Sequence, residues 1–208
     1  MTKDELISLP RIYNQPDNKI KAIEYLESRG LPYDERFQFC HYIPNLDLRN
    51  QLIIIGKSYG GKNNIVESRG LGTGVYSKLY QSSKSIPIWN LENYTGQKNI
   101  ILTESAIDSK SIEILELEDT LVISTYRASF SASQYYYLLS LFMSNNIYVA
   151  FDQDKSGIEN ATKLINQAYR HFKKNIFMLE ILGGKDSNEV LKKKGKDNLR
   201  KQILSQIL

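Results

Sequence analysis

The sequence of 208 residues contains a single cysteine, Cys40, and has no apolar run long enough to span a bilayer. One cysteine cannot form an intrachain disulfide, and it excludes a cysteine-rich zinc site. The N-terminal residues also lack the apolar segment of a signal peptide. We therefore expect a cytoplasmic protein with no membrane association.

The overall balance of residues is that of a soluble globular protein, with 41% hydrophobic and 24% charged residues. The length allows one substantial domain or two small ones. The net charge of +4 permits a nucleic-acid partner without requiring one. Basic residues crowd near the C-terminus, where a solvated helix face is favoured and a phosphate-contacting surface is the alternative. These residues are Lys192, Lys193, Lys194, Lys196, Arg200 and Lys201.

The first part of the chain, residues 1–97, is rich in turns. Apolar residues with helical spacing, followed by Gly30, predict a helix over residues 18–30. Short β-branched runs predict strands over residues 52–55 and 64–67, with a glycine turn between them. This pattern indicates a small mixed α+β subdomain.

From Lys98 onward, apolar strand patterns alternate with helical ones. Such alternation predicts an α/β domain over residues 98–194, with a mainly parallel sheet flanked by helices. We expect residues 195–208 to form a basic C-terminal tail. Capping-box spacing, Ser131 with Gln134 and Ser156 with Glu159, predicts two of the helix starts. The expected strands are 99–102, 121–124, 147–151 and 176–179, and the expected helices are 106–117, 131–143, 157–172 and 187–194.

Acidic residues stand just after three of these predicted strands. Glu104 follows the first strand, and Asp108 comes one helical turn later. Asp152 and Asp154 follow the third strand, and Asp186 follows the last. Because ligands of open parallel sheets bind beyond the carboxyl ends of the strands, we expect these carboxylates to line one edge.

Carboxylates that converge at one edge raise one another's pKa unless a cation neutralises them. Mg²⁺ prefers oxygen ligands and is shared between a few carboxylates, waters and substrate phosphates, so Mg²⁺ (or Mn²⁺) is the expected cofactor. Asp152 and Asp154 can point at a single ion, and Glu104 could act as a general base. Two simpler roles stay open: Asp186 could cap a helix, and Asp108 could face solvent.

The segments Glu104-Ser-Ala-Ile-Asp108 and Phe151-Asp-Gln-Asp-Lys-Ser-Gly157 resemble the signature of the Toprim fold. That domain is shared by bacterial (DnaG-type) primases, topoisomerases and some nucleases. The similarity to the primase catalytic core extends over residues 20–195, in the family's order. Four further segments carry it: Tyr25–Leu31, Glu67–Leu71, Ser77-Lys78 with Trp89–Leu91, and Arg127–Gln134.

This resemblance implies a nucleotidyltransferase that makes short RNA primers on a single-stranded DNA template from nucleoside triphosphates. It implies a phosphate-binding role for Arg69, Lys78 and Lys185, although solvation at the surface is an equal alternative for the first two. The catalytic carboxylates would be Glu104, Asp152 and Asp154, and the metal cluster would comprise Glu104, Asp108, Asp152, Asp154 and Asp186.

Several features depart from the family pattern. Ser105 stands where a glycine usually follows the first acid, and Asn188 replaces a second acid in the last motif. The cysteine-rich zinc module and the Gly-x-x-x-x-Gly-Lys-Ser/Thr loop of a helicase motor are absent from this sequence. A primase of this kind, as phages or mobile elements encode, would therefore need a helicase or another replication protein as a partner.

Two other functions are compatible with the same residues. A Toprim nuclease would use these acids to cleave a phosphodiester, and a degenerate core would serve as a non-catalytic DNA-binding or regulatory subunit of a replication complex. Three consecutive tyrosines, residues 135–137, could stack on bases. On a helix, at least one of them must face the core, so packing is the favoured interpretation.

Overall fold

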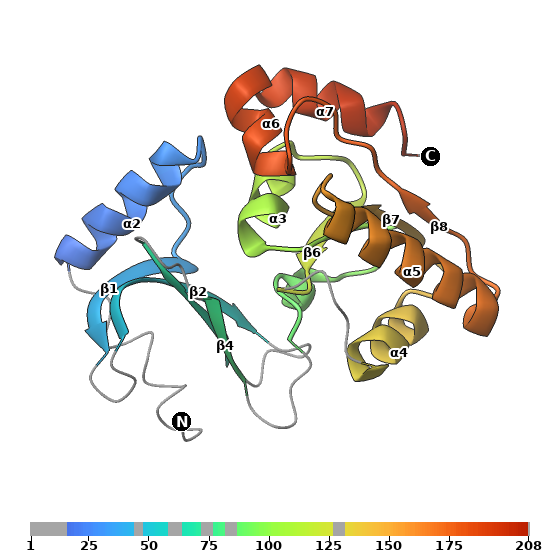
Figure 1. Ribbon diagram of the computed structural model, residues 1–208, viewed down its shortest axis with the longest axis horizontal. Coiled ribbons are helices and arrows are strands. Elements are labelled where there is room, and N and C mark those ends of the chain that lie inside the picture. The colour runs from blue at the N-terminus through green and yellow to red at the C-terminus, as the bar shows by residue number, and fades with distance from the viewer. Residues whose placement is uncertain are drawn as a thin grey trace. The chain divides into compact units, whose positions relative to one another are not determined.

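The computed structural model describes residues 16–43, 48–57, 64–71, 77–81, 87–126 and 132–207. The chain divides into two compact units, Met1–Glu92 and Asn93–Leu208, and each contains its own four-stranded sheet (Figure 1). No helix in these ranges is both long enough and apolar enough to cross a bilayer.

The N-terminal unit consists of helix α2 and an antiparallel sheet in the order β1-β2-β3-β4. Helix α2 (Pro16–Ser28) packs against β1 through the fully buried Ala22 and Leu26, and Gly30, with φ 71°, follows its end as expected. The predicted α+β character of this part is confirmed, with two more strands than the sequence pattern predicts. The strands are β1 (Phe37–Ile43), β2 (Leu48–Lys57), β3 (Asn64–Gly70) and β4 (Ser77–Gln81).

Arg36 fixes the segment after β4 to the N-terminal unit. Its guanidinium group donates to both carboxylate oxygens of Asp34 and, over 2.6 Å, to Asn90 Oδ1. The same group lies 4.3 Å from the ring centre of Trp89, which is fully buried beside Phe37. Residues 87–90 therefore belong structurally to this unit, and the short 3-10 helix η2 (Leu91–Asn93) follows them.

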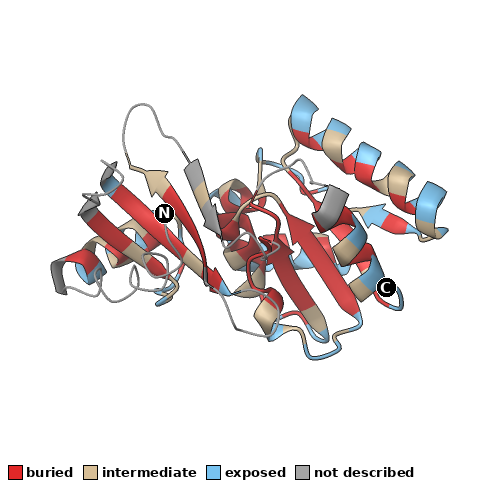
Figure 2. Ribbon diagram, turned by 90° about the horizontal axis from the view of Figure 1, so that it is seen from below, coloured by how far each residue is buried: buried red, intermediate tan, exposed pale blue. Residues whose placement is uncertain are grey.

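The C-terminal unit contains a fully parallel sheet in the order β6-β5-β7-β8. The predicted parallel sheet flanked by helices is confirmed. Every residue of β5 is buried, as is every residue of β7 except its first, Asn146, and the strands of this sheet are mostly red in Figure 2. Strands covered on both faces have nearly continuous apolar runs, as in Ile100–Leu102 and Ile147–Ala150. The strands are β5 (Asn99–Thr103), β6 (Thr120–Ser124), β7 (Asn146–Ala150) and β8 (Ile176–Met178).

Helices cover both faces of this sheet, with α4 and α5 on one side and α3, α6 and α7 on the other (Figure 1). Helix α3 packs on β5 and β6, and α6 packs on α3. Helices α4 and α5 meet through Tyr135 and Phe172, whose rings lie 6.0 Å apart. The helices are α3 (Ala106–Glu113), α4 (Ala132–Leu141), α5 (Lys155–Phe172), α6 (Ser187–Lys194) and α7 (Lys196–Leu204).

Residues 195–208, expected as a basic tail, contain helix α7, which is part of the C-terminal unit. Leu199 and Ile203, spaced i and i+4, are fully buried, and α7 packs on α6. Two glutamines, Gln202 in α7 and Gln206 just beyond its end, also bind the segment that follows β8. The side-chain amide of Gln202 bonds both the N–H and the C=O of Leu182, and that of Gln206 does the same with Glu180.

The double substitution Gln202→Leu with Gln206→Leu is expected to lower the free energy of unfolding by about 1–2 kcal/mol, because four exposed hydrogen bonds give way to water. Urea denaturation followed by circular dichroism measures the change. Lys201→Gln, an exposed change on the same helix, is the control. A double variant as stable as this control would contradict the structural role of the two amides.

Candidate functional site

Glu104 and Asp152 stand at the carboxyl ends of two neighbouring strands. Thr103, the last residue of β5, pairs with Ala150, the last of β7, so the two acids emerge side by side. The chain leaves β5 toward β6 in one direction and leaves β7 toward β8 in the other. A reversal of this kind opens a crevice in doubly wound sheets, and ligands bind there.

A hydrogen bond joins the two strand ends: the backbone N–H of Asp152 donates to Glu104 Oε1 over 3.1 Å. Gly157, in the first turn of α5, makes this approach possible. A Cβ atom at residue 157 would lie 2.1 Å from the carbonyl oxygen of Asp152 and 2.8 Å from Glu104 Oε1. No side chain fits there. No sequence pattern predicts this role, although Gly157 ends the segment that resembles the Toprim signature.

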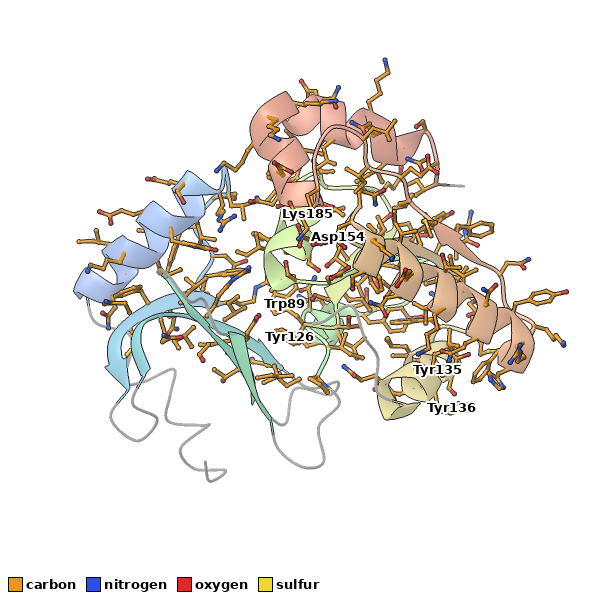
Figure 3. The ribbon with its side chains drawn as sticks, in the orientation of Figure 1. Trp89, Tyr126, Tyr135, Tyr136, Asp154 and Lys185 are labelled. Atoms are coloured by element: carbon orange, nitrogen blue, oxygen red, sulfur yellow. The ribbon has the colours of Figure 1, made fainter. Side chains whose placement is uncertain are left out.

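Asp152 and Asp154 both face the ammonium group of Lys185. Lys185 Nζ lies 3.0 Å from Asp152 Oδ2 and 3.2 Å from Asp154 Oδ2. Figure 3 shows Lys185 and Asp154 side by side, the former from the loop before α6 and the latter from the start of α5. Two carboxylates from the loop after β7 thus converge on one ammonium group from the loop before α6.

Asp154 also caps helix α5, because its carboxylate accepts the N–H of Gly157 over 2.9 Å. The capping box predicted for Ser156 and Glu159 is therefore wrong, and α5 begins two residues earlier than Gly157. A carboxylate at the N-terminus of a helix satisfies an otherwise unpaired N–H group and interacts favourably with the helix dipole. The other predicted box begins at Ser131, which lies outside the described residues.

The backbone of Lys185 is held from two sides. Its carbonyl accepts the N–H of Gln153 over 2.6 Å, and its own N–H donates to the carboxylate of Glu189. Asp186 caps α6 by accepting the N–H of Glu189 over 2.7 Å, as the simpler interpretation of this residue anticipates. The two loops that carry the charged groups are therefore tied together through main-chain atoms.

Asp108 belongs to a buried hydrogen-bonded cluster between α3 and α6. It is 7% exposed, so the alternative that it faces solvent is wrong. The Ser105 hydroxyl donates to one of its oxygens, and the N–H of Asn188 donates to the other over 3.3 Å. The side-chain amide of Asn188 in turn donates to the Ser111 hydroxyl over 3.0 Å.

The two departures from the family pattern thus meet at Asp108. Ser105 also caps α3 by accepting the N–H of Asp108, and its φ of −131° is open to any residue, so glycine is not required. Asn188 is buried and bonded to α3 rather than directed at the pair of Asp152 and Asp154. These observations favour a structural role for Ser105 and Asn188.

Burial and mutual repulsion raise the pKa of three of the acids, whereas hydrogen bonds lower that of the fourth. Burial, then the charge of Asp152, raises the pKa of Glu104 to about 7. Burial, then the charge of Asp186, raises the pKa of Asp108 to about 7. Burial also raises the pKa of Asp152, opposed by Lys185, whereas the N–H of Gly157 and then Lys185 lower the pKa of Asp154. Hydrogen bonds to Asp152 and Asp154 raise the pKa of Lys185. Acids with pKa values pushed apart are typical of sites with divided acid and base roles.

The donor set of Asp152 and Asp154 fits a magnesium or manganese ion. Among the described residues, no three His, Cys, Asp or Glu side chains form a ready-made metal cage. Mg²⁺ is usually held by one or two carboxylates together with waters and substrate phosphates, so two carboxylates suffice. Both already face a single positive group, with Glu104 beside them. Asp108 and Asp186, the other expected ligands, are engaged in the cluster and the cap described above.

Of the three residues expected to bind phosphate, Lys185 lies among the acids. Arg69 lies in β3 of the N-terminal unit, opposite Leu52 and Ser77, and is half-buried. Lys78 lies in β4 opposite Ser68, and its side chain is outside the described part.

The C-terminal basic residues serve local contacts in part. Lys193 pairs with Glu189 at 2.6 Å, Lys194 Nζ donates to the Leu182 carbonyl, and Arg200 donates to the Leu115 carbonyl.

The packing interpretation of the tyrosines is confirmed for Tyr135, which is buried against Phe172, whereas Tyr136 is half-exposed.

Comparison with known proteins identifies the class of domain first. Residues 101–191 match the Toprim-like family model. The fold is that of the catalytic core of DnaG-type primases, so the expected resemblance is confirmed. No curated protein matches the chain.

Three solved structures define the similarity. The zinc-binding and RNA polymerase domains of Aquifex aeolicus primase align with 99% of this chain at 18% identity and a TM-score of 0.73, and the chain spans 62% of that protein's length. The primase fragment of the bacteriophage T7 primase-helicase aligns with 86% of this chain and 73% of its own, at 18% identity and a TM-score of 0.65. A DnaG primase catalytic domain bound to single-stranded DNA aligns with 98% of this chain and 78% of its own, at 14% identity and a TM-score of 0.71.

Proposed function

We propose that this chain is a primase-like nucleotidyltransferase that synthesises short RNA primers on single-stranded DNA with Mg²⁺ or Mn²⁺. The observation that carries the proposal is the convergence of Asp152 and Asp154 on one cationic group beside Glu104, at the switch point of the sheet. The primase-core fold and the Toprim-like match support it. Single-stranded DNA on a related catalytic domain, and the primase-helicase nature of the T7 protein, support a DNA template and a helicase or another replication protein as partners.

The reaction joins a 3′-hydroxyl to the α-phosphorus of a nucleoside triphosphate, with pyrophosphate as the leaving group. A divalent cation held by Asp152 and Asp154 would offset the charge of the triphosphate and of the leaving group. Glu104, whose pKa is about 7, can accept the proton of the attacking hydroxyl at neutral pH. Arg69, Lys78 and Lys185 are proposed to bind phosphates of the template or the incoming nucleotide. Asp108 and Asp186 are proposed to support the acidic edge.

The proposal is tested by incubating the protein with single-stranded DNA, Mg²⁺ or Mn²⁺ and labelled ribonucleotides, and by resolving the products by length. New short RNA supports it. Shortened DNA would instead indicate a nuclease, and neither product, even with an added helicase or single-strand-binding protein, would indicate a non-catalytic subunit.

Asp152→Asn is expected to lower primer synthesis by about a hundredfold, because one of the two cation ligands loses its charge while the fold is kept. The rate of primer formation at saturating cation measures the effect. Glu118→Gln, an exposed change of the same charge in the C-terminal unit, is the control. Full activity in the Asp152 variant would show that this assignment of the site is wrong.

A further inference from the structure

Lys185 stands in the position that a divalent cation needs. Its ammonium group lies 3.0 Å from Asp152 Oδ2 and 3.2 Å from Asp154 Oδ2, so it uses the same oxygens that would bind the cation. We propose that Lys185 is a tethered competitor of the catalytic cation: it holds the two aspartates together without the cation and must swing away for the cation to bind. This inference rests on the cation site of the proposed function.

The anchoring of Lys185 makes the ammonium a local competitor. The carbonyl of Lys185 accepts the N–H of Gln153, and its own N–H donates to Glu189, so its main chain is fixed beside the loop of the two aspartates. An ammonium group on so short a tether has a high effective concentration at the aspartates. The side chain is 56% exposed, so it can turn into solvent without unpacking a core.

Charge makes the competition mutual. An ammonium group and a divalent cation on the same pair of carboxylates would repel each other at short range. If Lys185 is removed, the cation loses a competitor and also meets a pair of aspartates whose repulsion is no longer offset. Both effects act in the same direction, toward tighter cation binding. In the native protein, Lys185 therefore raises the Mg²⁺ concentration at which half of the sites are filled.

The test measures Mn²⁺ binding to the full chain by electron paramagnetic resonance of free Mn²⁺, in the absence of nucleotide and DNA. Lys185→Gln and Lys185→Met are expected to bind Mn²⁺ about tenfold more tightly than the native protein. The effect is no larger because solvent screens the interaction of a half-exposed ammonium group with the aspartates. Lys185→Arg, which keeps the positive charge, is expected to bind Mn²⁺ with an affinity within about threefold of the native one. Lys155→Gln, at the exposed start of α5 next to Asp154, removes a charge that lies 3.9 Å from Glu159, and it serves as the control for loss of a nearby positive charge.

Thermal unfolding gives a second measurement, which does not depend on catalytic activity. In a chelator, Lys185→Gln is expected to melt below the native protein, because the paired aspartates lose their partner. At the same Mn²⁺ concentration, a protein that binds Mn²⁺ more tightly is stabilised more. Mn²⁺ is therefore expected to raise the melting temperature of Lys185→Gln more than that of the native protein.

Unchanged or weaker Mn²⁺ affinity in both Lys185→Gln and Lys185→Met would overturn the inference. Primer synthesis decides the proposed function separately. Tighter binding in these variants, lost again when Asp152→Asn is added, supports competition at this site even if the protein makes no primers. Primer synthesis together with unchanged Mn²⁺ affinity in these variants would support the proposed function and show that Lys185 does not compete with the cation.

Discussion

Gly157→Ala is expected to reduce primer synthesis by about a hundredfold or more, because displacing a catalytic group by about 1 Å has an effect of that size. The new Cβ would lie 2.1 Å from the carbonyl oxygen of Asp152, a main-chain atom that cannot turn aside. Either α5 or the loop of Asp152 and Asp154 must move. The hydrogen bond from the Asp152 N–H to Glu104 is then lost, and with it the alignment of the two strand ends.

The same substitution is expected to lower the free energy of unfolding by about 1–3 kcal/mol, the usual cost of adding atoms to a packed site. Urea denaturation and primer synthesis measure the two effects on the same preparation. Thr162→Ala, on the exposed side of α5, adds no atom and is the control. If Gly157→Ala has native stability and native activity, the close approach at this position is not a requirement of the site.

The parallel sheet and the acids at its edge could be predicted because both follow from local patterns. Apolar runs that are buried on both faces show where each strand ends, and the residue after the run is then at the edge. Glu104 and Asp152 could be assigned in this way. Their direct hydrogen bond could not, because it depends on β5 and β7 being neighbours in exact register, which no local pattern specifies.

The features that the sequence pattern missed depend on contacts between distant segments. Strand β4 is short and largely polar and is defined by its pairing with β3. Helix α7 is mostly polar, and the burial of its apolar residues Leu199 and Ile203 depends on its packing against α6. Asp154 is predicted from the sequence as a catalytic and metal-binding carboxylate, and it also caps α5, because an aspartate just before a helix can accept an N–H of the first turn. Lys185 meets Asp152 across a sequence distance that no spacing rule covers.

Glu104→Gln is expected to lower primer synthesis by about a thousandfold, the middle of the range for loss of a general base. The glutamine keeps an oxygen that can accept the N–H of Asp152, so the strand ends stay aligned while the charge and the basic group are removed. Comparison with Glu118→Gln, an exposed acid of the same unit, separates this loss from a general effect of charge. Activity near the native level would assign the proton transfer to another group.

The same variant is expected to be more stable than the native protein at pH 8. Burial and the neighbouring aspartates raise the pKa of Glu104 from 4.5 to about 7, so the folded state binds its proton more tightly than the unfolded state does. Stability is therefore lost as pH rises from about 4.5 to about 7, and the ionised carboxylate destabilises the fold above that range. Glutamine carries no charge and avoids this cost. After a discount for solvent screening at this half-buried side chain, we expect the free energy of unfolding to rise by about 1–2 kcal/mol at pH 8, and the difference to vanish near pH 4.5. Urea denaturation in a chelator at both pH values measures it. Glu104→Ala, which also loses the hydrogen bond to the Asp152 N–H, should gain less stability. If the glutamine variant is no more stable than the native protein at pH 8, the ionised Glu104 carboxylate does not destabilise the fold.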